Sequence, residues 1–350
     1  MRKMGQMEAL DDIIKEHIES GYFSAAVCSI SLDGESVYRK AFGVCDLATV
    51  EPCRTDTRFD IASITKIFTS TVILHMITER RLTLDTSLGE CLPAAKSRPE
   101  LTSLTIRQLL THSSGLIAWY PLYTQRGRSF YEVLDSIPLL HESAEKTVYS
   151  DLNFMLLGKV IEQLTEMTLE EAVCEYFGNR LDLDSVTYLP LDKHNIAATE
   201  FGNRIEKRMC SERHLHFDGW RDEHTAIVGE VNDGNSYYFL NGTAGHAGIF
   251  SDADDLVTLG NLYLGVKGFL SDELLQACES RQVGDRGLGW DFGETFPEGF
   301  GHTGFTGTAL WVVPERQLIV SLLTNRLHSR EPQNITPFRK KIFNCILKNV

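Results

Sequence analysis

The sequence contains no long hydrophobic run. Its apolar stretches, such as residues 71–77, are much shorter than the ~20 residues that a membrane-spanning helix requires. The first residues lead directly into a charged, helical segment at residues 9–15, without the apolar core of a signal peptide. We therefore expect a soluble, cytoplasmic protein with no membrane partner.

Clusters of positive charge are also missing. Lysine and arginine form no dense block, and 34 basic residues stand against 48 acidic ones, which gives a formal net charge of −14. Nucleic acids and anionic membranes attract basic surfaces, so neither is an expected partner. The sequence favours a small-molecule partner and gives no indication of an oligomeric state.

Closely spaced metal ligands are absent as well. The eight cysteines stand far apart and form no Cys-x-x-Cys pair, so we interpret them as reduced thiols. A zinc hydrolase using His214, His216 and His224 is an alternative, but these residues lack the one-turn helical spacing of a metal-binding pair. No metal and no cofactor are expected.

Patterns typical of β-hairpins occur near both ends of the chain. The expected strands and their turns are residues 25–31, 33–34, 36–42, 308–313, 314–315 and 318–324. Amphipathic helices are expected outside the hairpins, at residues 8–20 and 336–348. These patterns predict one antiparallel sheet that is built from both ends of the chain and flanked by the terminal helices.

The middle of the chain is mostly helical in pattern and contains no internal repeat or low-complexity segment. The expected helices include residues 104–110, 129–134, 154–164 and 253–264. We predict an α/β fold of the α+β type, with residues 1–70 plus 285–350 forming the sheet domain and residues 71–284 an inserted helical region. The active-site cleft is expected between the two, because small-molecule sites commonly lie between regions.

The strongest local signal is the segment at residues 59–68, in which Ser63 and Lys66 stand three residues apart at the start of a helix. The continuation of this helix is apolar nearly all round, which predicts that it is buried. At ~3.6 residues per turn, the two side chains lie on one face and can meet. The alternative is a helix-capping serine followed by a solvated lysine.

A serine hydroxyl is a weak nucleophile until a neighbouring group takes its proton. Lys66 could take it if burial lowers the pKa of the amine well below its ordinary value of ~10.4, and we expect this here. The position of Ser63 near a helix N-terminus favours negative charge on an alkoxide or oxyanion.

Two further segments complete a pattern. Tyr149 and Asp151 precede a predicted helix, and the phenol of Tyr149 could relay a proton. Residues 301–307 precede a predicted strand and offer small residues and backbone N–H groups at a sheet edge. Taken singly, a half-buried structural tyrosine and an ordinary turn are the simpler interpretations.

Together, in this order and spacing, the three segments resemble the superfamily of class C β-lactamases, D-alanyl-D-alanine carboxypeptidases and related esterases, which carries Ser-x-x-Lys and Lys-Thr-Gly elements. The resemblance spans roughly residues 20–325. Residues 109–116 and 245–251 also look like markers of this family. The resemblance implies a β-lactamase/transpeptidase-like fold and an acyl-serine mechanism.

The resemblance implies roles for individual residues. Ser63 would attack the substrate carbonyl, and Lys66 and Tyr149 would pass its proton to the leaving group. The N–H groups of Ser63 and Phe305 would form the oxyanion hole. His302, Thr303 and Gly304 would line the site and orient the substrate, whereas His112 and His246 are interpreted as structural.

The chain departs from the class C pattern at two positions. Asp151 stands where Tyr-x-Asn has asparagine, and it could bind a substrate amide or ammonium or cap the following helix. His302 replaces the lysine of Lys-Thr-Gly and is a weaker anchor for a β-lactam carboxylate, since histidine titrates near pH ~6.5. We therefore expect an ester or amide substrate and weak β-lactamase activity. A catalytically weak penicillin-binding or ligand-binding protein is the alternative.

Overall fold

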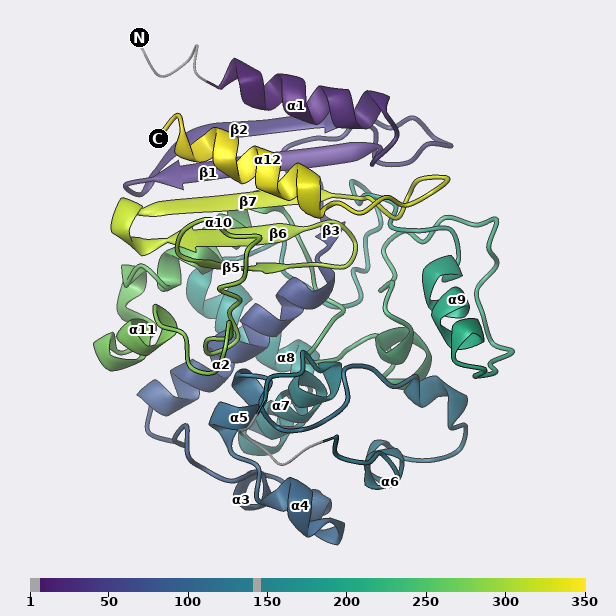
Figure 1. The fold of residues 1–350 in the computed structure, drawn as a ribbon, viewed down its shortest axis with the longest axis vertical. Helices are drawn as coiled ribbons and strands as arrows, with labels where there is room; N and C mark the ends of the chain where they lie inside the picture. Colours follow the sequence, from purple (N-terminus) through teal and green to yellow (C-terminus); the bar gives the residue numbers. More distant parts are fainter. Residues whose placement is uncertain (1–6, 141–145) are drawn as a thin grey trace.

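A five-stranded antiparallel sheet in the order β2-β1-β7-β6-β5 forms the centre of the fold. The computed structural model describes residues 7–140 and 146–350. The strands are β1 (Ala25–Leu32), β2 (Glu35–Gly43), β5 (Phe300–Thr303), β6 (Ala309–Val313) and β7 (Leu318–Thr324). Because β1 pairs with β7, the sheet joins the two ends of the chain, as predicted (Figure 1).

Helices cover both faces of this sheet, because successive side chains of each strand point to opposite faces. In β1, Ala25 and Val27 belong to the hydrophobic cluster that includes α10 (Ala253–Leu262). Ala26 and Cys28 belong to a second cluster, with α1 (Glu8–Glu19) and α12 (Thr336–Leu347). The two terminal helices lie side by side on the sheet in Figure 1, so the predicted flanking helices are confirmed.

The other α-helices lie between the two hairpins, where loops and short 3₁₀ or π-helical turns connect them. They are α2 (Thr65–Thr78), α3 (Leu88–Cys91), α4 (Pro99–Thr102), α5 (Ile106–Leu110), α6 (Phe130–Asp135), α7 (Asp151–Thr165), α8 (Leu169–Val173), α9 (Arg204–Glu212) and α11 (Asp272–Cys278). The division at residues 70 and 285 stays a prediction. Within the expected inserted region, α10 packs on β1 and β7.

The start of α2 is fixed by a second, two-stranded sheet. In it, β3 (Phe59–Asp60) pairs with β4 (Phe250–Ser251), and the Ile61 N–H donates to the Ile249 carbonyl at 3.1 Å. The chain then turns through a short 3₁₀ helix into α2, which packs against α7 and is buried along most of its length, as its apolar sequence predicts. In the part of the chain that the structure describes, no helix has the length and apolar character needed to cross a membrane.

Asn325 ties the end of β7 to three other parts of the chain. Its side-chain oxygen accepts hydrogen bonds from the N–H groups of Ser24 at 3.1 Å and Ala25 at 2.8 Å. Its amide nitrogen lies 3.3 Å from the Cys45 carbonyl and 3.1 Å from the Ala198 carbonyl. The side chain is buried, so each of these groups would lose its partner without gaining water.

Replacing Asn325 with alanine is expected to lower the free energy of unfolding by about 3 kcal/mol, because several buried groups lose their partners at once. Denaturant unfolding followed by circular dichroism measures this change. Asn179→Ala is the matched control, since Asn179 is exposed and donates to Glu175, and it should change stability by less than about 0.5 kcal/mol. Equal effects of the two substitutions would contradict this role of Asn325.

Candidate active site

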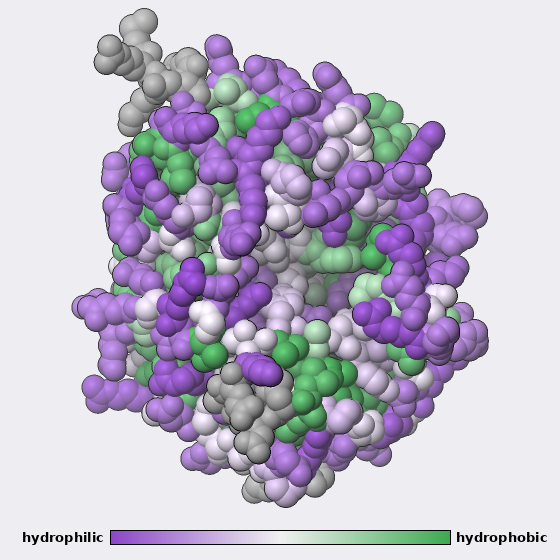
Figure 2. All heavy atoms as spheres, viewed as in Figure 1, coloured by the Kyte–Doolittle hydropathy of each residue, from purple (hydrophilic) through white to green (hydrophobic). Residues whose placement is uncertain are grey.

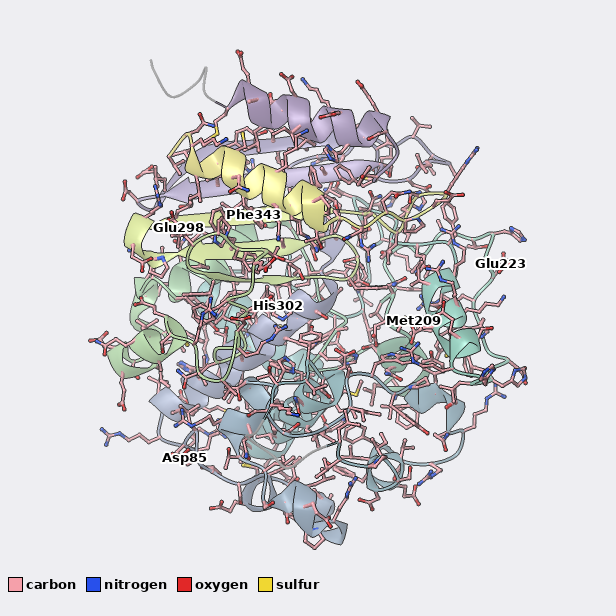
Figure 3. The ribbon with its side chains drawn as sticks, in the orientation of Figure 1. Asp85, Met209, Glu223, Glu298, His302 and Phe343 are labelled. Carbon is pink, nitrogen blue, oxygen red and sulfur yellow. The ribbon has the colours of Figure 1, made fainter. Side chains whose placement is uncertain are left out.

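A cavity of about 490 Å³ lies between the β5 edge of the sheet and the helical region. Its walls include seven of the residues singled out in the sequence, namely Ser63, Tyr149, Asp151, His302, Thr303, Gly304 and Phe305. Figure 2 shows this face of the molecule hollowed near its middle. In Figure 3, His302 at the end of β5 and Met209 on α9 mark two sides of the cavity.

Lys66 follows Ser63 by three residues, and its side chain contacts the Ser63 hydroxyl. Its ammonium donates to the Ser63 Oγ at 2.9 Å and to the backbone carbonyl of His246 at 3.1 Å. The Asp151 carboxylate is its counter-charge, 2.8 Å away. The Lys66 side chain is 0% exposed, so this charge is held wholly by protein groups.

The structure corrects the expectation that the pKa of Lys66 is lowered. Burial alone would lower it, but the Asp151 carboxylate and the Tyr149 hydroxyl outweigh burial and raise the pKa of Lys66 above its ordinary value. In the resting state Lys66 is therefore an ammonium that donates to Ser63, and it has no free electron pair with which to accept the serine proton.

Asp151 forms an ion pair with Lys66 that neither sequence-based interpretation included. It is the first residue of α7, and its carboxylate pairs with Lys66. The N-cap position of α7 belongs to Ser150, whose hydroxyl donates to the Ile117 carbonyl at 2.6 Å. The Asp151 side chain also lines the cavity and is 17% exposed, so a bound molecule can reach it.

Tyr149 is held against Lys66 by the buried His112. The ring centroid of Tyr149 lies 4.9 Å from the Lys66 ammonium and 4.6 Å from the His112 ring. Burial keeps the pKa of His112 well below its ordinary value, so the ring is neutral and its Nδ1 accepts the Ser150 N–H at 3.0 Å. His112 thus has the geometry of a structural residue that orients the turn carrying Tyr149.

The backbone before Ser63 is strained. Ala62 has a φ of +47°, a left-handed conformation that is unfavourable for a residue other than glycine. Its N–H donates to the Asp60 carboxylate at 2.8 Å, and the Asn232 N–H donates to the same carboxylate at 2.7 Å. Burial raises the pKa of Asp60 to about 6. These contacts hold the turn that presents Ser63 to the cavity.

The segment after β5 packs closely on this turn. The Thr306 hydroxyl donates to the Asp60 carbonyl at 2.7 Å, and the Thr308 hydroxyl donates to the Ile61 carbonyl at 3.0 Å. Only glycine fits at position 304, because a Cβ there would lie 2.0 Å from the Thr308 Oγ1 and 2.5 Å from the Ile61 oxygen. The small residues of this segment therefore allow it to pack closely on the turn that carries Ser63.

Phe305 offers a backbone donor in the segment that packs on the turn before Ser63, and both residues line the cavity. Among the described residues, nothing accepts a hydrogen bond from its N–H, whereas its carbonyl accepts one from Arg326 Nε at 2.8 Å. Arg339 holds the same segment by donating to the carbonyls of Gly304 and Thr308, each at 2.8 Å. The Phe305 N–H is thus free to bind an oxygen of a ligand.

His302 is neutral in this site. It is buried, and burial together with the positive charges of Lys66 and Arg286 holds its pKa well below the ordinary value. One ring nitrogen, Nδ1, lies 3.0 Å from the Thr303 carbonyl. His302 therefore supplies no positive charge for a substrate carboxylate at pH 7.

Several charged residues of the cavity were not predicted. Arg286, Arg326 and Arg339 line it, as do Glu206 and Asp233. They come from α9, α12 and loops that are distant in the sequence, and none stands in a pattern with a chemical meaning of its own. The zinc alternative gains no support, since residues 7–140 and 146–350 contain no group of three or more His, Cys, Asp or Glu side chains placed to hold a metal.

Known proteins are similar to this chain over most of its length. The family model described as Beta-lactamase matches residues 10–342. A putative D-alanyl-D-alanine carboxypeptidase of Escherichia coli (strain K12) is 29% identical over 368 residues, covering 93% of this chain and 83% of the relative. An N-acetylmuramyl-L-alanine amidase of Bacillus subtilis (strain 168) is 29% identical over 370 residues, covering 93% and 82%.

Solved structures share the fold. EstCE1, a hydrolase with promiscuous acyltransferase activity, superposes with a TM-score of 0.76 at 19% identity, covering 97% of this chain and 99% of that one. A β-lactamase/D-alanine carboxypeptidase from Pseudomonas syringae gives a TM-score of 0.76 at 18% identity, covering 98% and 99%. The predicted fold class is confirmed.

Asp151→Asn tests the electrostatic role of the ion pair. Loss of the negative charge leaves burial less opposed, so the pKa of Lys66 falls and its free amine, which could take the Ser63 proton, forms at lower pH. The acid limb of kcat/KM for a chromogenic ester should shift to lower pH by about one unit or more. Asp56→Asn, at an exposed ion pair with Arg54, should leave the limb in place. An unmoved limb in Asp151→Asn would contradict the role.

Proposed function

Because this chain belongs to the β-lactamase family, we propose that it is a serine hydrolase that cleaves an ester or amide through an acyl-serine intermediate. One observation carries the proposal: Ser63 lines the cavity with its Oγ 2.9 Å from the buried ammonium of Lys66. A capping serine with a solvated lysine would not give this arrangement.

In the first step, the Ser63 oxygen forms a bond to the substrate carbonyl carbon. Since Lys66 is already protonated, the phenolate form of Tyr149, stabilised by the adjacent ammonium, accepts the serine proton and becomes a neutral phenol. The N–H groups of Ser63 and Phe305 bind the carbonyl oxygen as it becomes negative. When the bond to the leaving group breaks, Tyr149 returns the proton to the leaving nitrogen or oxygen.

In the second step, water takes the place of the leaving group. It gives a proton to Tyr149, attacks the acyl carbon and releases the carboxylic acid, and the proton returns to Ser63. Slow water activation would leave the acyl group on Ser63. A protein that binds penicillin with little turnover is therefore the second candidate, favoured by the ion pair that keeps Lys66 from acting as a base.

Arg286 is the proposed anchor for a carboxylate on the leaving group. Its guanidinium lines the cavity 5.0 Å from the Tyr149 ring centroid, and its contact with Asp291 is long, at 3.6 Å. Guanidinium groups bind carboxylates with two parallel hydrogen bonds. The names of both relatives given above describe alanine compounds, and alanine released from an amide would carry such a carboxylate.

Ser63→Ala is expected to reduce hydrolysis of p-nitrophenyl acetate and butyrate by at least about 1,000-fold, because the nucleophile is lost. Ser70→Ala is the matched control, since the Ser70 hydroxyl is buried in the same helix without a hydrogen-bond partner in the described chain. Turnover should persist in that variant. Equal turnover by wild type and Ser63→Ala would exclude the proposal, and stable labelling by a fluorescent penicillin without turnover would favour the second candidate.

Arg286→Gln is expected to remove a preference for substrates with a free carboxylate. For N-acetyl-D-alanyl-D-alanine against its C-terminal amide, the wild type should favour the acid by about 10-fold or more in kcat/KM, or in competitive inhibition of ester hydrolysis. The variant should show a ratio near one, while p-nitrophenyl acetate hydrolysis measures any general damage. A preserved ratio in Arg286→Gln would show that another group binds the carboxylate.

A further inference from the structure

One wall of the cavity is built from hydrogen-bond acceptors. Asn232 and Asp233 come from the loop before a π-helical turn (Asn235–Phe239), and Glu206 comes from α9. They line the same cavity as Ser63. This wall adjoins the catalytic lysine through His246, whose carbonyl accepts from Lys66 and whose Nε2 lies 2.9 Å from the Asp233 Oδ1.

Asp233 is ionised and partly open to the cavity. Burial would raise its pKa, but the contact with His246 and the Ser236 N–H outweigh burial and lower the pKa to about 2. His246 and the Ser236 N–H, the latter at 2.8 Å, both contact Oδ1, and in the described chain no hydrogen bond reaches the second carboxylate oxygen. The side chain is 22% exposed, so that oxygen can accept a donor from a bound molecule.

Glu206 adds a second carboxyl beside Asp233. The Tyr123 hydroxyl and the Gly234 N–H each donate to it at 2.8 Å. Burial, followed by the negative charge of Asp233, raises the pKa of Glu206 well above its ordinary value, which favours the protonated form. A bound cation would oppose this shift and favour the ionised form of Glu206.

Asn232 provides an independent indication of a missing ligand. Its side chain is only 5% exposed and lines the cavity, yet its Oδ1 has no hydrogen-bond partner among the described residues. A buried oxygen without a hydrogen-bond donor destabilises the protein unless a donor reaches it. Both Asn232 and Asp233 thus offer unused acceptors, and a ligand that carries several N–H donors and a positive charge satisfies both.

We infer that this acceptor wall, formed by Asn232, Asp233 and Glu206, binds a primary ammonium group on the acyl part of the substrate. The inference rests on the proposed function and narrows it to acyl groups with a free amine, such as α-aminoacyl groups. An ammonium has three donors and one charge, which match two free oxygens and the ionised Asp233. With a carboxylate at Arg286, the substrate would carry opposite charges at its two ends.

The test compares substrates that differ only in this group. Alanyl p-nitroanilide and isobutyryl p-nitroanilide have the same shape, with an ammonium in one replaced by a methyl in the other. Both alanyl enantiomers are measured. The wild type is expected to favour an alanyl compound by at least about 10-fold in kcat/KM, or in Ki against p-nitrophenyl acetate where the anilide is not cleaved.

Asp233→Asn should bring this ratio to near one, and Glu206→Gln provides a second variant that should lower it if the first is unstable. Glu223→Gln removes one negative charge at an exposed position outside the cavity and should keep the wild-type ratio (Figure 3). A ratio near one in wild type, or a ratio unchanged in both wall variants, overturns the inference. Failure of the proposed function would look different, as Ser63→Ala would then hydrolyse p-nitrophenyl acetate as well as wild type.

Discussion

A buried ammonium group organises the site. Lys66 is shielded from water, and a charge in the protein interior is tolerated only with a counter-charge and hydrogen-bond acceptors. Asp151 at the start of α7, Ser63 at the start of α2 and the carbonyl of His246 supply them. Two helices and one loop must therefore meet at a single point, and the packing of α2 on α7 brings them there.

The same ion pair determines which group can move a proton. With Asp151 beside it, Lys66 is a fixed positive charge, and in the proposed mechanism Tyr149 exchanges the proton with Ser63. His112, neutral because it is buried, keeps that phenol in place by accepting the Ser150 N–H. Gly304 and Thr308 pack the segment after β5 on the turn that carries Ser63, and in the proposed mechanism the Phe305 N–H of this segment binds the carbonyl oxygen.

Local patterns were enough to predict the sheet and the residues around Ser63. Alternating strands around tight turns marked both hairpins, and the Ser63/Lys66 spacing, Tyr149 and the glycines after β5 each stand in a short motif. The raised pKa of Lys66 was not predictable, because it depends on a carboxylate 85 positions away that folding places 2.8 Å from the amine. Arg286 and Asp233 were missed for the same reason, since only folding brings them to the cavity that they both line.

The central claim is that Ser63 carries the acyl group. The most direct measurement is mass spectrometry of protein quenched with acid during turnover of p-nitrophenyl butyrate, followed by digestion with trypsin. Cleavage after Arg58 and Lys66 releases residues 59–66, which contain Ser63 as the sole serine. The account predicts one butyryl group on this peptide, located at Ser63 by fragmentation and absent from Ser63→Ala. A butyryl group on another residue during productive turnover would contradict it.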